Sequence, residues 1–177
     1  SLIGFNSHNY PKRLLNCPDA PILLYSKGET DLNSQKFVSI VGTRHATEYG
    51  RDWCEKFVFE LAKMFPDVVI VSGLAYGIDV CSHRAALECG VRTVAVLGNP
   101  LNNIYPSTHR NTANKISENG ALISEYSSQS PMLKVNFVAR NRIVAGMSDA
   151  TVIVESKEKG GSLITASLAS DYSREVF

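Results

Sequence analysis

Three runs of apolar, largely β-branched residues each end at a turn that contains glycine, and a helical pattern follows each turn. The runs and their glycines are 38–41 before Gly42, 68–71 before Gly73 and 93–97 before Gly98. Buried parallel strands have this composition, and the helices between them carry the chain back across the sheet. We therefore expect an α/β fold with a mostly parallel sheet.

The rest of the chain continues the same alternation of strands and helices. Apolar periodicity, capping residues and turn residues set the approximate limits of the other elements. The predicted strands are 121–124 and 151–154, and the predicted helices are about 48–65, 79–90, 107–118, 136–147 and 161–172, with a polar loop over 127–135. Asp79 is the expected N-cap of the second of these helices.

Length and composition limit the number of domains. The 177 residues are 44% hydrophobic and 20% charged, which suits one globular domain with an ordinary core. We expect the turn-rich residues 1–35 to form an irregular lead-in that packs on a main domain of residues 36–177. The chain begins at Ser1 and stops within what resembles another strand at 174–177, so we interpret it as a piece of a longer protein.

Charge and cysteine content narrow the function classes. A net charge of +1 does not indicate a broad nucleic-acid surface, so any site for a polyanion must be a local cluster. The four cysteines lack the C-x-x-C spacing of zinc sites, which favours reduced, packed thiols, no bound metal and a cytoplasmic location. With no apolar run of about 18 residues and no signal-peptide pattern, we expect a soluble protein without a membrane partner.

Motifs of dinucleotide-binding and hydrolytic enzymes are missing. A Rossmann dinucleotide site needs G-x-G-x-x-G after the first strand, whereas the next glycine after Gly42 is Gly50, and no acidic residue ends the second strand. The P-loop, G-x-S-x-G and H-E-x-x-H patterns are also absent. Ser72 and Ser162 have no local base, so we expect their hydroxyls to serve helix N-termini. The sequence therefore predicts no cofactor and no catalytic residue.

The glycine turns instead suit phosphate. Glycine lacks a Cβ, so a phosphate can approach the N–H groups of the turn and of the helix that follows. Because the carboxyl ends of parallel strands meet at one edge of a sheet, we expect one cleft to be bordered by Gly42, Gly73, Gly98 and Gly161. Arg44 directly follows the first strand, so we expect its guanidinium near this cleft, with an ordinary surface arginine as the alternative.

The segment 131–143 combines aromatic, cationic and amide side chains. On a helix that begins near residue 136, Phe137, Arg140 and Asn141 share one face. Lys134 lies in the loop just before it. A single strand of nucleic acid needs a ring on which a base can stack and cations that meet its phosphates. The alternative for Phe137 is the core-facing position of an amphipathic helix.

Several of these segments together resemble the bacterial DNA-processing family known as DprA or Smf. The segments that carry the resemblance are 41–44, 72–79 with His83, 96–98 with Tyr105, Pro106 and His109, 136–137 with 140–143, and 161–166. The resemblance implies an extended Rossmann-like domain, with helices on both faces of the sheet, that binds single-stranded DNA without a sequence code. It also implies a homodimer that helps to load the RecA recombinase during natural transformation.

The family's DNA pocket implies roles for particular positions of this chain. Thr43 stands where the family usually has serine, and it keeps the hydroxyl. Asp79 and His83 look like structural positions, Asp79 as a cap and His83 bonded to a neighbouring turn. With the glycine turns included, the predicted DNA-binding residues are Gly42, Thr43, Arg44, Gly73, Lys134, Phe137, Arg140, Asn141, Gly161 and Ser162.

A nucleotide-hydrolysing enzyme is the alternative from another class. Cytokinin-activating phosphoribohydrolases have a related α/β plan and a Gly-Gly-x-Gly-Thr turn followed closely by a catalytic glutamate, and residues 160–165 form a similar turn. Residues 166–169 supply no carboxylate, however, and Glu155 and Glu158 precede the turn. A protein-interaction module is a third alternative, without a sequence feature of its own.

Overall fold

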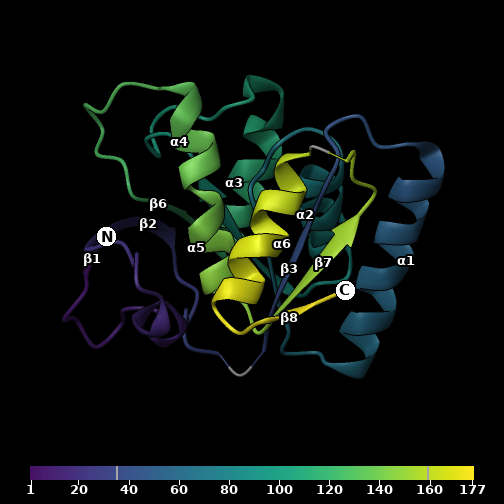
Figure 1. The fold of residues 1–177 in the computed structure, drawn as a ribbon, viewed down its shortest axis with the longest axis horizontal. Helices are drawn as coiled ribbons and strands as arrows, with labels where there is room; N and C mark the ends of the chain where they lie inside the picture. Colours follow the sequence, from purple (N-terminus) through teal and green to yellow (C-terminus); the bar gives the residue numbers. More distant parts are fainter. Residues whose placement is uncertain (35, 159) are drawn as a thin grey trace.

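One mixed sheet organises the computed structural model, which describes residues 1–34, 36–158 and 160–177. Within these residues, eight strands pair in the order β1-β2-β6-β5-β4-β3-β7-β8 (Figure 1). The strands are β1 (Leu2–Gly4), β2 (Leu23–Gly28), β3 (Phe37–Gly42), β4 (Val69–Ser72), β5 (Arg92–Leu97), β6 (Ala121–Ser124), β7 (Ala150–Val154) and β8 (Glu175–Val176). The pairs from β6 to β8 are all parallel, whereas β1 and β2 add antiparallel. The predicted α/β fold is therefore confirmed.

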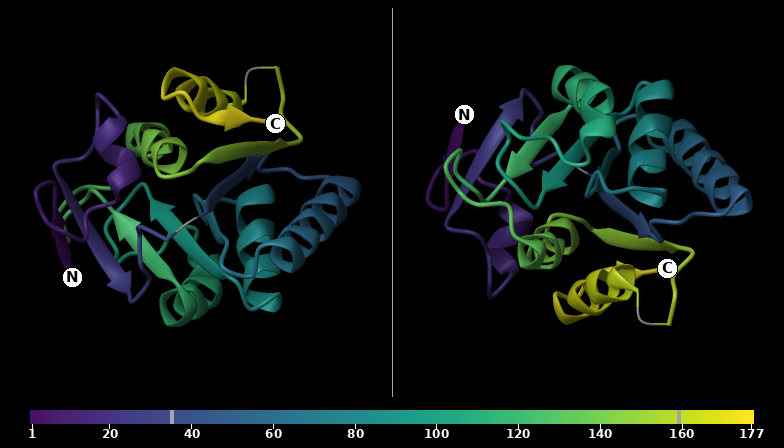
Figure 2. Two further views of the ribbon diagram at one scale, coloured as in Figure 1. Left: turned by 90° about the horizontal axis from the view of Figure 1, so that it is seen from below. Right: turned by 90° about the horizontal axis from the view of Figure 1, so that it is seen from above.

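Helices cover both faces of this sheet, as the resemblance implied (Figure 2). One face carries α1 (Glu48–Met64), α2 (Ile78–Glu88) and α3 (Arg110–Asn119), and the other carries η1 (Lys12–Asn16), α5 (Asn141–Gly146) and α6 (Gly161–Asp171). Along β4, Val69 and Val71 pack in the core beneath α5 and α6, whereas Ile70 packs in the core beneath α1 and α2. A strand buried on both faces is apolar along most of its length, which explains the near-continuous apolar runs in the sequence.

The helix predicted over 136–147 is longer and has a junction within it. Helical structure starts earlier, with α4 (Lys134–Ala139), so the end of the predicted loop over 127–135 is helical. Arg140 stands between α4 and α5 with helical angles, φ −57° and ψ −29°. The chain therefore continues in helical geometry from α4 into α5.

The start of α2 differs from the prediction. The N-cap is Gly77, whose φ of 76° suits glycine, and Asp79 lies in the first turn of the helix. Asp79 is therefore not the N-cap. The helix predicted over 107–118 is also divided, into η2 (Ser107–His109) and α3.

The first 34 residues join the sheet as well as packing on it. β2 pairs antiparallel with β6, and β1 pairs with β2. Tyr10, Leu14 and Leu24 are buried in the same core as α5 and α6. The segment is thus less irregular than predicted, because it extends one edge of the sheet. The boundary expected at residue 35 lies outside the described residues.

The four cysteines are free thiols, as their spacing predicted, and Cys17, Cys54 and Cys81 are buried. Within the described part of the chain, no group of three or more His, Cys, Asp or Glu side chains could hold a metal ion. Across the same residues, no helix combines the length and apolar character needed to cross a membrane.

Candidate nucleic-acid interface

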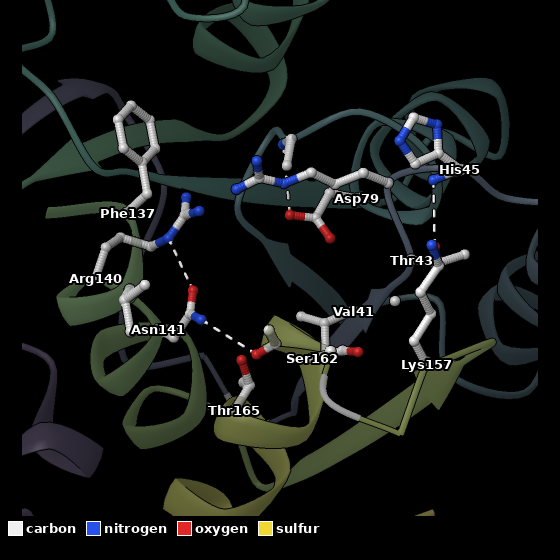
Figure 3. A pocket seen from close by; sticks show the side chains of 16 residues that line it. Val41, Thr43, His45, Asp79, Phe137, Arg140, Asn141, Lys157, Ser162 and Thr165 are labelled. Carbon is white, nitrogen blue, oxygen red and sulfur yellow. Dashed lines mark hydrogen bonds between the residues drawn. The ribbon is translucent and has the colours of Figure 1, made fainter. Parts of the chain in front are cut away.

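A cavity of about 260 Å³ opens at the carboxyl ends of β3 and β7 (Figure 3). Its walls come from the turn after β3, the turn before α2, the junction of α4 and α5, and the loop between β7 and α6. β3 has β4 on one side and β7 on the other, so the connections diverge at this point of the sheet. Open α/β sheets bind their ligands at such a switch point.

The glycine turns contribute to this cavity in two ways. Gly42 and Gly161 lie on its wall, so the predicted shared cleft is confirmed for this pair, whereas the prediction is wrong for Gly73 and Gly98, which are not part of the wall. Gly73 lies behind the cavity wall and packs against Arg140, because a Cβ added to Gly73 would be 2.5 Å from the guanidinium carbon of Arg140. Gly73 therefore makes room for an arginine that lines the cavity.

The turn after β3 presents a cation to the cavity. The N–H of Thr43 donates to the carbonyl of Glu155 at 2.7 Å, and the Thr43 hydroxyl accepts from the N–H of His45 at 3.2 Å. These bonds fix the turn from which the exposed Arg44 side chain extends. Within the described residues, Arg44 forms no ion pair. Its charge is therefore available to an anion in the cavity that it lines.

Arg140 lies deeper than predicted. The residue is only 4% exposed, and its guanidinium donates to the backbone carbonyls of Gly73, at 2.6 Å, and of Val96. Its Nε donates to Asn141 Oδ1 at 3.3 Å. The prediction that Arg140 meets DNA phosphate as a free cation is therefore not supported by this geometry, because these bonds hold it against the ends of β4 and β5.

Asp79 fixes the turn beside Arg140. Its carboxylate accepts from the N–H groups of Gly73, at 3.2 Å, and Ala75, at 3.4 Å. Burial raises the pKa of the Asp79 carboxyl, whereas the positive charge of Arg140 and these N–H groups act to lower it. Asp79 therefore has the structural place that the resemblance implied, although it holds the turn after β4 rather than capping α2.

Asn141 joins two walls of the cavity. Its Oδ1 accepts from Arg140, and its Nδ2 donates to the Gly161 carbonyl at 3.4 Å (Figure 3). Gly161 and Ser162 begin α6, and the first N–H groups of a helix have no partner within it. The Ser162 hydroxyl is 2.7 Å from that of Ser156, and no side chain of the described residues caps α6, so the prediction that this hydroxyl serves the helix N-terminus is wrong. The start of α6 therefore presents hydrogen-bond donors that suit an anion.

Phe137 is half-buried and lies at the cavity rather than in the core. Its ring centroid is 5.4 Å from that of Tyr105. Gly98 lies against it, since an added Cβ there would be 2.9 Å from the Phe137 Cα. Phe137 lines the cavity, and the core clusters formed by the described residues do not include it. The alternative of a core-facing phenylalanine is therefore wrong.

Two lysines lie near the site, and only Lys134 was predicted there. Lys134 begins α4 and is exposed, but it is not part of the cavity wall. Lys157 does line the cavity, and the sequence analysis missed it. Its position three residues before the phosphate-friendly turn at Gly160 is the sequence signal that indicates it.

A neutral histidine lies behind the site. His83 Nδ1 is 2.6 Å from Thr93 Oγ1, which itself donates to the Ile70 carbonyl at 2.9 Å, so the imidazole is the donor to the threonine. Burial lowers the pKa of His83 to about 3, and the charges of Arg140 and His109 act in the same direction. His83 is thus structural, but it bonds to β5 rather than to a turn.

The His83 pKa predicts a pH dependence of stability. In the folded protein the pKa of His83 is lowered from 6.5 to about 3. The contribution of the neutral imidazole to the free energy of unfolding is therefore present above pH 6.5 and is lost as the pH falls toward 3. Between about pH 6.5 and pH 5.5, urea unfolding should show that the unsubstituted protein loses about 1 kcal/mol more stability than His83→Gln. Equal losses in the two proteins would contradict a buried, neutral His83.

The whole chain matches one family model. Residues 1–177 match the model described as DNA recombination-mediator protein A. Protein Smf of Escherichia coli is 41% identical over 177 residues, which are 99% of this chain and 47% of that protein. This chain spans about half the length of the curated relatives it matches.

Solved structures of the same family have the same fold. DNA processing protein A (DprA) from Streptococcus pneumoniae superposes with a TM-score of 0.94 at 38% identity, over 100% of this chain and 62% of that one. DprA from Helicobacter pylori, whose structure is described by its single-stranded DNA binding mode, has a TM-score of 0.89 at 34% identity, over 100% of this chain and 79% of that one. This chain therefore belongs to the DNA recombination-mediator protein A family, which includes DprA and Smf.

Proposed function

We propose that this chain binds single-stranded DNA, without reading its sequence, in the cavity between the turn after β3 and the start of α6. The observation that carries the proposal is the meeting of Arg44, Lys157 and the half-buried Phe137 ring in one cavity. A single strand offers both phosphates and exposed bases. The two cations can bind the phosphates, and the ring can stack on a base. The single-stranded DNA binding mode described for the H. pylori relative supports the same proposal.

The phosphate contacts come from two segments that both line the cavity. One is the Gly42 turn with Thr43 and Arg44, and the other is the start of α6 at Gly161 and Ser162 with Lys157 before it. Within the described residues, neither of these two cations forms an ion pair. Lys134 adds a third cation at the start of α4, outside the wall.

The base contact comes from Phe137, on which any base can stack because every base has a π-face. Asn141 forms the wall beside it, and Arg140, packed against Gly73, adds positive potential while it positions that wall. Backbone, phosphate and stacking contacts carry little sequence information. Sequence-independent binding follows from this set of contacts.

The chain's larger role is to act as a homodimer that protects incoming DNA and helps to load RecA during natural transformation. The family description, a DNA recombination mediator, supports this proposal. We place this role in the cytoplasm, where the free thiols would stay reduced.

We propose binding rather than catalysis. Among the described residues that line the cavity, Asp79 supplies the only carboxylate, and it is buried and used by two backbone N–H groups. Glu155 accepts from the N–H and hydroxyl of Thr47, and these bonds lower the pKa of its carboxyl. Neither carboxylate is placed as the glutamate of a phosphoribohydrolase would be. A base-release assay with nucleoside monophosphates tests this, since release of free base would contradict the proposal.

Binding of matched oligonucleotides tests the proposed function. We expect tighter binding to a single strand than to a blunt duplex of the same sequence, because a duplex offers no exposed base to Phe137. With three cations meeting phosphates, log affinity should fall with log salt at a slope near −2, from about −0.7 per contact on a single strand. Fluorescence anisotropy across a salt series measures both. Equal affinity for the two forms would overturn the stacking argument, and a slope near zero would overturn the phosphate contacts.

A further inference from the structure

We propose that the bound strand leaves this cavity across Arg44 and continues into a second groove, where Tyr76 is another stacking surface for a base. The inference rests on the proposed function, because the ligand is the next part of the same single strand. It assigns a binding role to the surface between the start of α1 and α2, which none of the predicted DNA-binding residues except Arg44 touches.

The second groove is built from cationic and aromatic side chains. Its lining includes Arg44, Arg51, Glu55, Tyr76, Arg84 and Tyr105. These come from the turn after β3, from α1, from the turn before α2 and α2 itself, and from the loop before η2. The groove therefore has the composition that binds single strands, rings for bases beside cations for phosphates.

Two features place the groove directly beside the cavity. Arg44 lines both of them, so a phosphate that it binds stands at the boundary. The ring of Phe137 in the cavity is 5.4 Å from the ring of Tyr105 in the groove, measured between centroids. A strand that stacks on Phe137 therefore meets the second groove next.

The cations of the groove are available to phosphate. Arg51 donates one guanidinium N–H to the Ala46 carbonyl at 2.6 Å, and Arg84 donates from Nε to Thr112 Oγ1 at 3.4 Å. A guanidinium has five N–H donors, so each of these arginines keeps N–H groups that can donate to a phosphate. In the described part of the chain, neither arginine is within ion-pair distance of Glu55 or of another carboxylate.

Tyr76 is held in place while much of it stays open to solvent. Its ring meets the buried His109 imidazole edge-on, at 5.0 Å between centroids and 70° between planes. The His109 Nδ1 is in turn 2.8 Å from the Leu74 carbonyl, which anchors it to the same turn. Tyr76 nevertheless keeps 46% of its surface exposed. A fixed, exposed ring loses little freedom when a base stacks on it.

The length of the DNA separates the two parts of the site. We would measure binding of oligothymidylates of about 4 and about 16 nucleotides, the range of single-strand site sizes, to the unsubstituted chain, Tyr76→Ala and Arg84→Ala. Tyr76→Ala should weaken binding of the longer oligonucleotide about tenfold and leave the shorter one unchanged. Arg84→Ala should reduce the salt slope for the longer one by about 0.7.

Matched controls isolate the groove from general effects. Tyr76→Phe keeps the ring and should bind both lengths normally. Phe59→Ala removes an exposed ring on α1, and Arg92→Ala removes an exposed cation at the opposite end of the sheet; neither lines the cavity or the groove. Both should bind like the unsubstituted chain. Thermal unfolding of each variant corrects for the folded fraction.

The outcomes distinguish this inference from the proposed function. Normal binding of the longer oligonucleotide by Tyr76→Ala and Arg84→Ala would overturn the second groove and leave the cavity as the site. Equal weakening of both lengths would also overturn it, because the groove would then act only through the cavity. If the unsubstituted chain bound neither length, the proposed function itself would fail.

Discussion

Replacing Arg140 with methionine should lower the free energy of unfolding by about 3–5 kcal/mol, as expected when one member of a buried charged set is removed. The guanidinium donates to the carbonyls of Gly73 and Val96, and its charge opposes the effect of burial on the Asp79 carboxyl. Methionine fills similar space but leaves these acceptors without their partner. Urea unfolding followed by circular dichroism measures the loss.

Two controls show whether the loss comes from the hydrogen bonds of Arg140 to the Gly73 and Val96 carbonyls. Arg140→Lys should recover only part of the stability, because an ammonium is a point charge that cannot copy the planar fork. Arg92→Met removes an exposed arginine and should change stability by less than about 0.5 kcal/mol. If Arg140→Met folded with normal stability and lost only DNA binding, Arg140 would contact a phosphate directly, and its hydrogen bonds to the strand ends would not be needed for stability.

The sheet and most helices could be predicted because their patterns are local. A parallel strand buried on both faces is largely apolar, as β4 is from Val69 to Val71, and such runs stand out in the sequence. β1 and β2 could not be predicted as part of the sheet. β2 pairs with β6, so the partner of Tyr25 is Ser124, about a hundred positions away, and no local pattern encodes that pairing.

The candidate site was predictable in position but not in depth. Parallel topology brings Gly42 and Gly161 to one cleft, and this follows from strand order alone. Helical periodicity placed Phe137 and Arg140 toward that cleft but could not show that the arginine is buried. Its depth depends on Gly73, far away in the sequence, whose missing Cβ leaves space for the guanidinium.

Phe137→Ala should weaken binding of single-stranded DNA by about 1–3 kcal/mol, the range for loss of one base stacked on an aromatic ring. The salt slope should stay unchanged, because no phosphate contact is removed. Lys157→Ala is the matched opposite: it should weaken binding and reduce the slope by about 0.7, since one phosphate contact is lost. Anisotropy titrations of both variants across the same salt series measure these two effects separately.

Thermal stability decides whether the Phe137 effect belongs to binding. A phenylalanine in a core costs about 3–5 kcal/mol of stability when it is cut back to alanine. Phe137 is half-buried, packs against Tyr105 and belongs to none of the core clusters of the described residues, so its removal should cost clearly less than that. Affinity should therefore fall in protein that remains folded. A strongly destabilised Phe137→Ala whose folded fraction still binds normally would remove the ring from the site and leave the phosphate contacts of Arg44 and Lys157 to carry the binding alone.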